Sequence, residues 1–376
     1  MVLAGSPLTP CLPDGPQARP EVESLQSYSA PLEGRRGLLR LDFNENTVGP
    51  SPKVVEAIRA IPADHYAIYP EYNGLREAVV ANLGLPALTP AHIGLFNGVD
   101  AAIHALFHAF GAAGDVLLTT SPTFGYYTPC AQMQGMAITA IPYLGTDFAF
   151  PMGAIRTALL MQPSPRLLLL CNPNNPTGTR LAPELILELA AAAPDTLVVV
   201  DELYEAFTGD SALPIADFAA TPNLLVLRSL AKTAGLAGLR IGFAIGPEAL
   251  VDRLGRVTGP YDINSFAVTA ARAALADQAF TDTYVAEVLR SRRWLLEQLH
   301  NAGVRHHAAG GNYLLIWPSR PAQAVEAELR ASGILVRSMA GKPLIDGSLR
   351  VSIGTREQME RFWAAYREIE NLSSLP

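Results

Sequence analysis

Short apolar runs recur through the middle of the chain, and each run ends in a polar or glycine-rich turn. The runs lie at 116–118, 167–170, 197–200 and 224–227. Runs this short and this uniformly apolar, separated by helix-like stretches, are typical of buried strands in a mostly parallel sheet. The pattern therefore predicts an α/β fold with a mostly parallel central sheet flanked by helices.

The helix-like stretches begin at recognisable start signals. Ser51 and Pro52 supply a cap and a first-turn proline, and the apolar stripe of residues 54, 55 and 58 follows them. A second helix is expected to open at 97–100, because the apolar residues after it keep the i, i+3, i+4, i+7 spacing. Residues 1–37 hold many helix breakers and no sustained period, which indicates irregular structure.

The pattern changes after about residue 266. A long helical pattern is followed by shorter strand-like and helix-like stretches, which predict helices at 267–299 and 322–331 and from 356 on, and strands at 312–316, 334–336 and 349–353. This mixture is typical of a smaller α+β domain. We expect an N-terminal segment docking on the body (1–45), a large ligand-binding domain (46–265) and a small C-terminal domain (266–376).

Composition and charge narrow the class of protein. The 376 residues are 49% hydrophobic and 17% charged, as in a globular protein with a substantial core. A formal net charge of −7 leaves no basic excess for a row of phosphates, so a nucleic-acid partner is not expected. The widely spaced Cys11, Cys130 and Cys171 favour a reducing compartment. Neither a secretory signal nor a membrane span is apparent, and we predict a soluble cytoplasmic protein.

Polar side chains follow the last three apolar runs. The turn 172–178 follows the first of them, Asp201 and Tyr204 follow the second, and Ser229 and Lys232 follow the third. Ligands of open parallel sheets bind at the carboxyl ends of the strands. These side chains are therefore candidates for one binding site.

The residue types indicate the ligand. A buried carboxylate such as Asp201 and a buried amine such as Lys232 are costly unless each meets a partner. A ligand with a basic ring nitrogen and an aldehyde satisfies both, because the acid keeps the ring protonated and the lysine forms a Schiff base. The backbone N–H groups at 98–100, together with Arg240, can bind a phosphate. These features specify pyridoxal 5'-phosphate, with a structural Lys232–Asp201 ion pair as the alternative interpretation.

The motifs around these residues resemble those of a known family. Asn174-Asn175-Pro176-Thr177-Gly178, the Asp201-x-x-Tyr204 unit and Ser229-x-x-Lys232 followed by Gly-Leu-Ala-Gly-Leu-Arg stand in the order found in the fold-type-I pyridoxal-phosphate aminotransferases. The resemblance covers nearly the whole chain from about Tyr28. The strings 41–46, 49–52, 69–70, 260–264 and 349–357 are most similar to those of histidinol-phosphate aminotransferases.

The resemblance implies a role for each matching residue around the cofactor. Lys232 would hold the cofactor and shuttle a proton, and Asp201 would pair with the pyridinium nitrogen. Asn175 and Tyr204 would hydrogen-bond the ring hydroxyl, and Phe124 would stack on the ring, unless it is simply a core residue. The cofactor phosphate would be held by Gly98, Val99, Asp100, Ser229, Arg240 and, from a neighbouring subunit, Tyr69.

The resemblance also implies substrates and assembly. Arg337 and Arg350 would face the anionic end of the substrate, unless they form structural salt bridges, and Tyr28 would lie near it. Histidinol phosphate would be the amino donor and 2-oxoglutarate, a 2-oxo acid, the acceptor, which places the enzyme in histidine biosynthesis. A role for Tyr69 across subunits implies at least a homodimer.

Three departures from the family pattern leave other functions open. Ala231 replaces a phosphate-binding serine, residues 99–101 replace Ser-Asp-Glu, and Thr47 replaces a proline. Aromatic or other amino acids are alternative donors, and a lyase or cyclase reaction on the same cofactor, such as decarboxylation of a phosphorylated amino acid, is a further alternative. A regulator with an aminotransferase-like domain is disfavoured, because residues 1–37 are too short and proline-rich for a DNA-binding domain. No metal site is expected, because His104 and His108 lack a third ligand.

Overall fold

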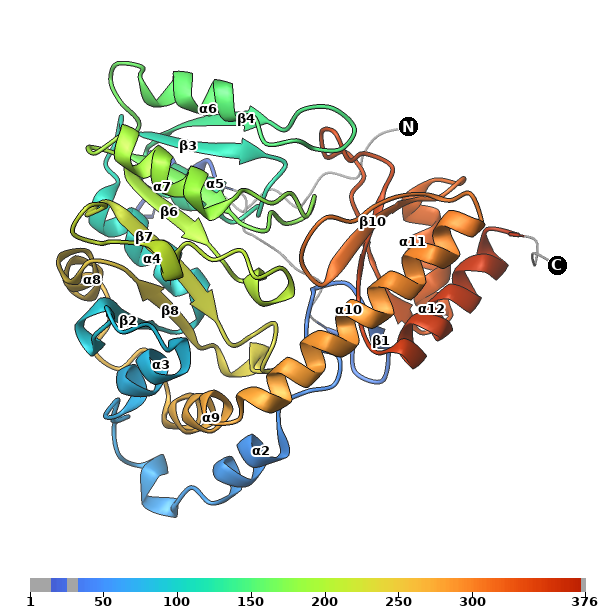
Figure 1. Cartoon of the computed structure of the whole chain (residues 1–376), viewed down its shortest axis with the longest axis horizontal. Coiled ribbons are helices and arrows are strands. Elements are labelled where there is room, and N and C mark those ends of the chain that lie inside the picture. Colours follow the sequence, from blue (N-terminus) through green and yellow to red (C-terminus); the bar gives the residue numbers. More distant parts are fainter. Residues whose placement is uncertain (1–14, 26–32, 373–376) are drawn as a thin grey trace.

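The computed structural model describes residues 15–25 and 33–372, which form two lobes (Figure 1). The larger lobe is built on a seven-stranded sheet and the smaller on a four-stranded sheet. A two-stranded parallel pair joins β1 (Leu39–Arg40) to β11 (Ile334–Leu335), so the N-terminal part of the chain reaches the small lobe.

The large sheet has mostly parallel strands. Only β8 runs antiparallel to its two neighbours, and the remaining pairs are parallel. The order across the sheet is β2 (Ile93–Phe96), β8 (Gly242–Ile245), β7 (Leu224–Ser229), β6 (Leu197–Asp201), β5 (Leu167–Cys171), β3 (Val116–Ser121) and β4 (Ala137–Pro142). The four apolar runs of the sequence are β3, β5, β6 and β7, so the predicted α/β class and mostly parallel sheet are confirmed.

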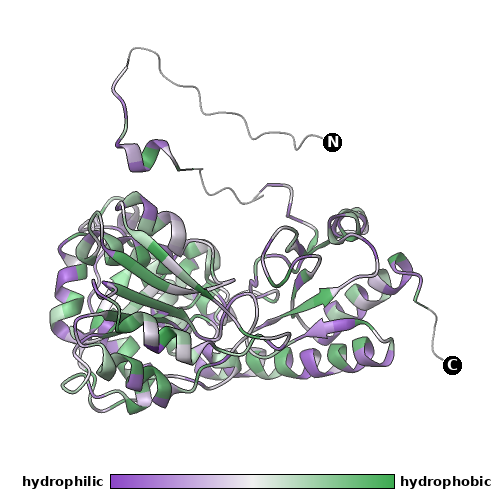
Figure 2. Ribbon diagram, turned by 90° about the horizontal axis from the view of Figure 1, so that it is seen from above, coloured by the Kyte–Doolittle hydropathy of each residue, from purple (hydrophilic) through white to green (hydrophobic). Residues whose placement is uncertain are grey.

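Helices cover both faces of this sheet. Leu168 and Val198 face one core cluster, whereas Leu169 and Val199 face another on the opposite side. Strands buried on both faces are expected to be apolar throughout, which is the pattern of β5 and β6. Figure 2 shows that the strands of the larger lobe are mostly hydrophobic. The helices of this lobe are α2 (Pro52–Arg59), α3 (Leu75–Leu83), α4 (Gly98–Phe110), α5 (Tyr127–Met133), α6 (Met152–Leu159), α7 (Pro183–Ala192), α8 (Glu248–Gly255) and α9 (Ser265–Leu275).

Shorter helices lie at the turns of the chain. A four-residue helix, α1, spans Pro20–Glu23 within the stretch expected to be irregular. The 3-10 helices are η1 (Ala63–Tyr66), η2 (Pro90–His92), η3 (Glu205–Phe207), η4 (Leu213–Ile215) and η5 (Ala237–Leu239).

The small lobe is an α+β unit with its own core cluster. Its four-stranded sheet is antiparallel, in the order β12 (Arg337–Ser338), β13 (Leu349–Ser352), β10 (Tyr313–Trp317) and β9 (Arg305–His307). It packs with α10 (Gln278–Asn301), α11 (Ala322–Ala331) and α12 (Arg356–Ile369). Figure 1 shows α10 running from beside α9 into the small lobe.

The single helix expected at 267–299 is in fact two helices, α9 and α10. The break lies at Ala276 and Asp277, and the Asp277 carboxylate accepts hydrogen bonds from Ser51 and, at 2.7 Å, from the Lys53 ammonium. The apolar face of α9 belongs to the core of the large sheet. The packing of α9 therefore places this helix in the large lobe. The predicted domain limits of 1–45, 46–265 and 266–376 stay a prediction. Among the described helices, none combines the length and apolar character needed to cross a bilayer.

Candidate active site

The strand ends that the sequence singled out meet at a cavity of about 240 Å³. Its walls come from both lobes and from the N-terminal segment, because Phe43, Thr123 and Met339 all line it. Six of the predicted site residues also line it: Phe124, Asn175, Tyr204, Lys232, Arg337 and Arg350.

Lys232 follows β7 and turns its side chain towards the N-terminal segment. Its Nζ donates a hydrogen bond of 3.0 Å to the backbone oxygen of Phe43. Burial lowers the pKa of the Lys232 ammonium to about 8, and the positive charge of Arg350 acts in the same direction. A lysine with this pKa is partly neutral at neutral pH, so its amine can act as a nucleophile or exchange a proton.

Asp201 is the last residue of β6 and is only 2% exposed. The Tyr127 hydroxyl donates to one carboxylate oxygen at 2.6 Å, and the Leu203 backbone N–H donates to the other at 3.3 Å. Burial raises the pKa of Asp201 to about 6, although both hydrogen bonds oppose that change. A carboxylate buried this way is suited to a cationic ligand group that would restore its charge.

A hydrogen-bond network joins the predicted ring-hydroxyl residues. The Tyr204 hydroxyl accepts from the side-chain amides of Asn44 at 3.1 Å and Asn175 at 3.3 Å. The Arg350 guanidinium donates to the Asn175 side-chain oxygen at 2.8 Å and also to the backbone oxygen of Asp42. The network fixes these polar groups at the cavity wall before any ligand binds.

The proposed phosphate cradle lies where α4 begins. Gly98 has a φ of +77°, and a Cβ on it would approach the Arg240 guanidinium to 2.5 Å. The Arg240 guanidinium also pairs with the Asp100 carboxylate at 2.9 Å. A Cβ on Gly242 would similarly lie 2.6 Å from the backbone nitrogen of Val99. The backbone at the start of α4 is therefore kept clear of side chains, as anion binding by backbone N–H groups requires.

Ser229 lies at the end of β7, beside this cradle. Its hydroxyl donates to the backbone oxygen of Ile241 at 3.1 Å and accepts from the N–H of Ala231 at 3.1 Å. Ala231 itself is buried. The serine hydroxyl thus holds the turn that carries Lys232, and Ala231 offers no hydroxyl of its own.

The cavity is not lined by the other predicted residues that the structure describes, which are Gly98, Val99, Asp100, Asp201, Ser229, Arg240 and Tyr69. The Tyr69 side chain is on the surface, 71% exposed, and its ring stacks on Tyr261 with centroids 4.1 Å apart. Tyr69 lines a separate surface pocket with His65 and Arg272. Tyr28 lies outside the described residues.

Several residues with close contacts in the site carried no assigned role in the sequence analysis. They are Phe43, Asn44, Tyr127, Met339 and Lys342. Asn44 stands in a string that supported the resemblance, so the sequence held a signal for it. Tyr127 gave none, because no motif surrounds it and a tyrosine in a short helix is commonly an ordinary core residue.

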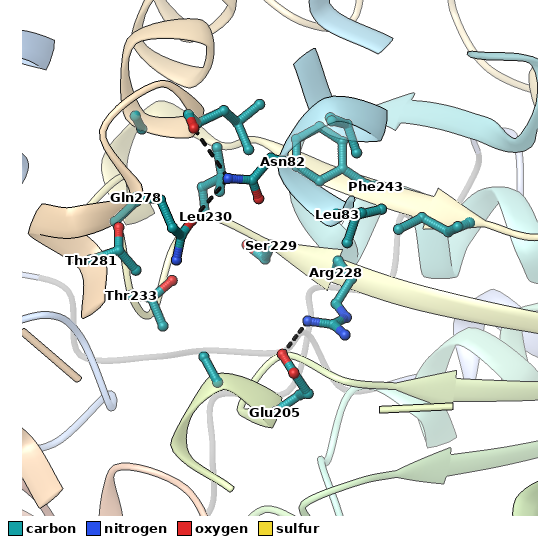
Figure 3. Close-up of a pocket in the computed structure, with 16 residues that line it drawn as sticks. Asn82, Leu83, Glu205, Arg228, Ser229, Leu230, Thr233, Phe243, Gln278 and Thr281 are labelled. Carbon is teal, nitrogen blue, oxygen red and sulfur yellow. Dashed lines mark hydrogen bonds and ion pairs between the residues drawn. The ribbon is translucent and has the colours of Figure 1, made fainter. Parts of the chain in front are cut away.

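A second cavity, of about 130 Å³, lies beside Ser229 at the end of β7 (Figure 3). Ser229, Leu230 and Thr233 line it, but Lys232 does not. Its main charged groups are already paired, because Arg228 bonds to Glu205 and to Glu202. We therefore assign the chemistry to the cavity that contains Lys232.

Comparison with known proteins agrees with this geometry. The family model of class I and II aminotransferases matches residues 36–365, and the chain belongs to that family. It is 32% identical to a histidinol-phosphate aminotransferase of Moorella thermoacetica over 94% of this chain and 93% of that protein. It is 34% identical to one of Roseiflexus castenholzii over 93% and 97% of the two chains.

Solved structures place the fold in the same group. The histidinol-phosphate aminotransferase of Sinorhizobium meliloti in complex with pyridoxal-5'-phosphate superimposes with a TM-score of 0.85, at 25% identity, over 96% of this chain and 99% of that one. An aspartate aminotransferase variant of Thermus thermophilus gives a TM-score of 0.77, at 26% identity, over 93% and 100% of the two chains. The chain therefore has the fold-type-I aminotransferase fold, and it is a transaminase.

Proposed function

We propose that this transaminase uses pyridoxal 5'-phosphate to transfer the amino group of histidinol phosphate to 2-oxoglutarate, a step of histidine biosynthesis. The observation that carries the proposal is one cavity with a lysine of lowered pKa in its wall and two arginines, Arg337 and Arg350, facing the same space. The names of the relatives from Moorella and Roseiflexus support the choice of substrate.

The residues present fit the cofactor. Lys232 would hold it covalently through its amine, and Asp201 would bind its ring nitrogen. Asn175 and Tyr204 would contact the ring hydroxyl, with Phe124 against the ring face. The phosphate would lie on the cradle formed by Gly98, Val99, Asp100, Ser229 and Arg240.

The chain's own groups then have defined tasks. When bound, the cofactor supplies an electron sink for the electrons of a broken Cα–H bond. Asp201 keeps a proton at the ring nitrogen, and its buried setting makes that charge pairing favourable. Lys232 would move the proton from Cα to C4′ of the cofactor, because an amine with a pKa of about 8 can exchange protons near neutral pH. Arg337 and Arg350 bind the anionic end of either substrate.

We further propose a homodimer in which Tyr69 reaches the phosphate of the neighbouring subunit. Tyr66, Ile68 and Tyr69 expose large apolar side chains on the same segment, and Tyr261 stacks on Tyr69. Burial of such a patch in a subunit interface is favourable. The position of Tyr69 away from the cavity of its own chain is consistent with that role.

Spectral titration of the purified protein loaded with pyridoxal phosphate tests the proposed function. Histidinol phosphate, phenylalanine, tyrosine, aspartate and glutamate are added one at a time in single-turnover experiments. We expect histidinol phosphate to convert the bound cofactor rapidly to its amine form. Conversion by an aromatic amino acid but not by histidinol phosphate would contradict the substrate, and release of carbon dioxide would contradict transamination.

A further inference from the structure

The wall of the active-site cavity carries an excess of positive charge. Lys232, Arg337, Lys342 and Arg350 all line it, and no aspartate or glutamate is among its described lining residues. The sequence contains three lysines, and only Lys53 lies away from this cavity. Lys342 was not among the residues expected to bind ligand.

Two of these cations have no carboxylate partner among the described residues. In the described part of the chain, no ion pair includes Arg337 or Lys342. By contrast, Arg35 and Arg228 each contact two carboxylates. The Arg337 guanidinium lies 5.7 Å from the centroid of the Phe43 ring, on the cavity side of the N-terminal segment. The excess charge is thus available to an incoming anion.

The turn that carries Lys342 is held in place by Asp346. One oxygen of the Asp346 carboxylate accepts from the backbone N–H of Gly341 at 2.7 Å and of Gly347 at 2.9 Å. The Trp317 indole N–H donates to the Asp346 backbone oxygen at 3.1 Å. The Lys342 backbone N–H donates to the backbone oxygen of Met339 at 3.1 Å. The backbone of a turn ordered in this way loses little further entropy when the Lys342 side chain meets a ligand.

We propose that Lys342 is a third substrate-binding cation, which favours donors that end in a doubly charged phosphate over donors that end in a singly charged carboxylate. This proposal rests on the proposed function, because it assigns the phosphate end of the amino donor to the space between Arg337, Lys342 and Arg350. Two guanidinium groups suffice for a carboxylate, whereas a phosphate monoester carries a second negative charge and a third acceptor oxygen at neutral pH. Partial desolvation beside the cavity, together with the positive charges of Arg337 and Arg350, lowers the pKa of Lys342, although its side chain stays exposed. A dianion among these three cations would relieve their mutual repulsion.

The test compares Lys342→Met with the parent enzyme on two amino donors. We expect kcat/KM for histidinol phosphate to fall about 10- to 100-fold, as for loss of one charge-assisted hydrogen bond. The value for glutamate should fall less than about threefold. Lys342→Arg restores most of the activity on histidinol phosphate. Lys53→Met, which removes a surface cation on α2, is the matched control and should change neither value.

Inorganic phosphate gives a second readout that does not depend on turnover of histidinol phosphate. As a competitive inhibitor of the glutamate half-reaction, it should bind Lys342→Met about tenfold more weakly than the parent. Equal losses for both donors, or unchanged phosphate inhibition, would overturn the role of Lys342. If the parent enzyme does not convert histidinol phosphate, the proposed function fails, and the phosphate inhibition still decides whether Lys342 binds a dianion.

Discussion

Replacing Asp201 by Asn should make the cofactor-free protein more stable while it disables the enzyme. Asp201 is 2% exposed, and burial raises its pKa from 3.8 to about 6. That difference corresponds to about 3 kcal/mol of unfolding free energy. At neutral pH the parent protein loses this unfolding free energy by ionising the buried Asp201. The variant does not, because the Asn side chain is neutral.

The sign and the pH range follow from the two pKa values. Because the folded-state pKa is the higher one, the folded protein binds more protons than the unfolded chain between about pH 4 and pH 6. The parent therefore loses stability as the pH rises through this range, and the Asp201→Asn variant lacks this loss. About half of the 3 kcal/mol is lost above pH 5, so the stability of the variant relative to the parent should rise by 1–2 kcal/mol between about pH 5 and pH 8.

Urea unfolding of the cofactor-free proteins at these two pH values measures the effect. Asp195→Asn, which changes an exposed carboxylate, is the matched control and should show no such pH-dependent gain. With pyridoxal phosphate bound, Asp201→Asn should transaminate about 100-fold more slowly or worse, because the charge opposite the ring nitrogen is gone. A stability difference that is the same at both pH values, or transamination at the parent rate, would refute the reasoning.

Further predictions concern the cofactor and the interface. Gly98→Ala should weaken pyridoxal phosphate binding about tenfold or more in equilibrium titrations, because the added Cβ meets the Arg240 guanidinium at 2.5 Å and strains a φ of +77°; unchanged affinity would contradict the cradle. Burial lowers the pKa of Lys232 to about 8. The rate of cofactor uptake by the cofactor-free protein should therefore rise with the neutral amine through about pH 8 and level off above about pH 9; a rate still rising well beyond that would contradict it. Tyr69→Ala should weaken both cofactor binding and dimerisation in sedimentation experiments, and a cofactor-saturated dimer unchanged by it would exclude the intersubunit role.

The parts of the fold that could be predicted from the sequence share one property. The runs that form β5, β6 and β7 are buried on both faces. Their uniformly apolar composition is therefore enough to predict buried strands. The binding role of polar residues at or just beyond the ends of these strands, such as Asp201 and Lys232, follows from the rule that ligands bind at the carboxyl ends of parallel strands.

The remaining features depend on contacts between distant segments. The break between α9 and α10 at Asp277 is fixed by Ser51 and Lys53, more than two hundred residues away in the sequence, and no local signal separates the two helices. Tyr127, at the start of α5, reaches Asp201, at the end of β6, only in the folded chain, and Phe43 meets Lys232 only once the N-terminal segment lies across the site. Lys342 lies in a turn whose position depends on the pairing of β12 with β13. Tertiary packing, which single-sequence patterns do not report, decided each of these.

The most direct test of the account is to find the lysine that carries the cofactor. The protein is loaded with pyridoxal phosphate, reduced with borohydride and digested, and the labelled peptide is sequenced by mass spectrometry. With three lysines in the chain, the outcome is unambiguous. We predict stoichiometric label on Lys232 alone; label on Lys53 or Lys342 instead, or no label at all, would contradict the account.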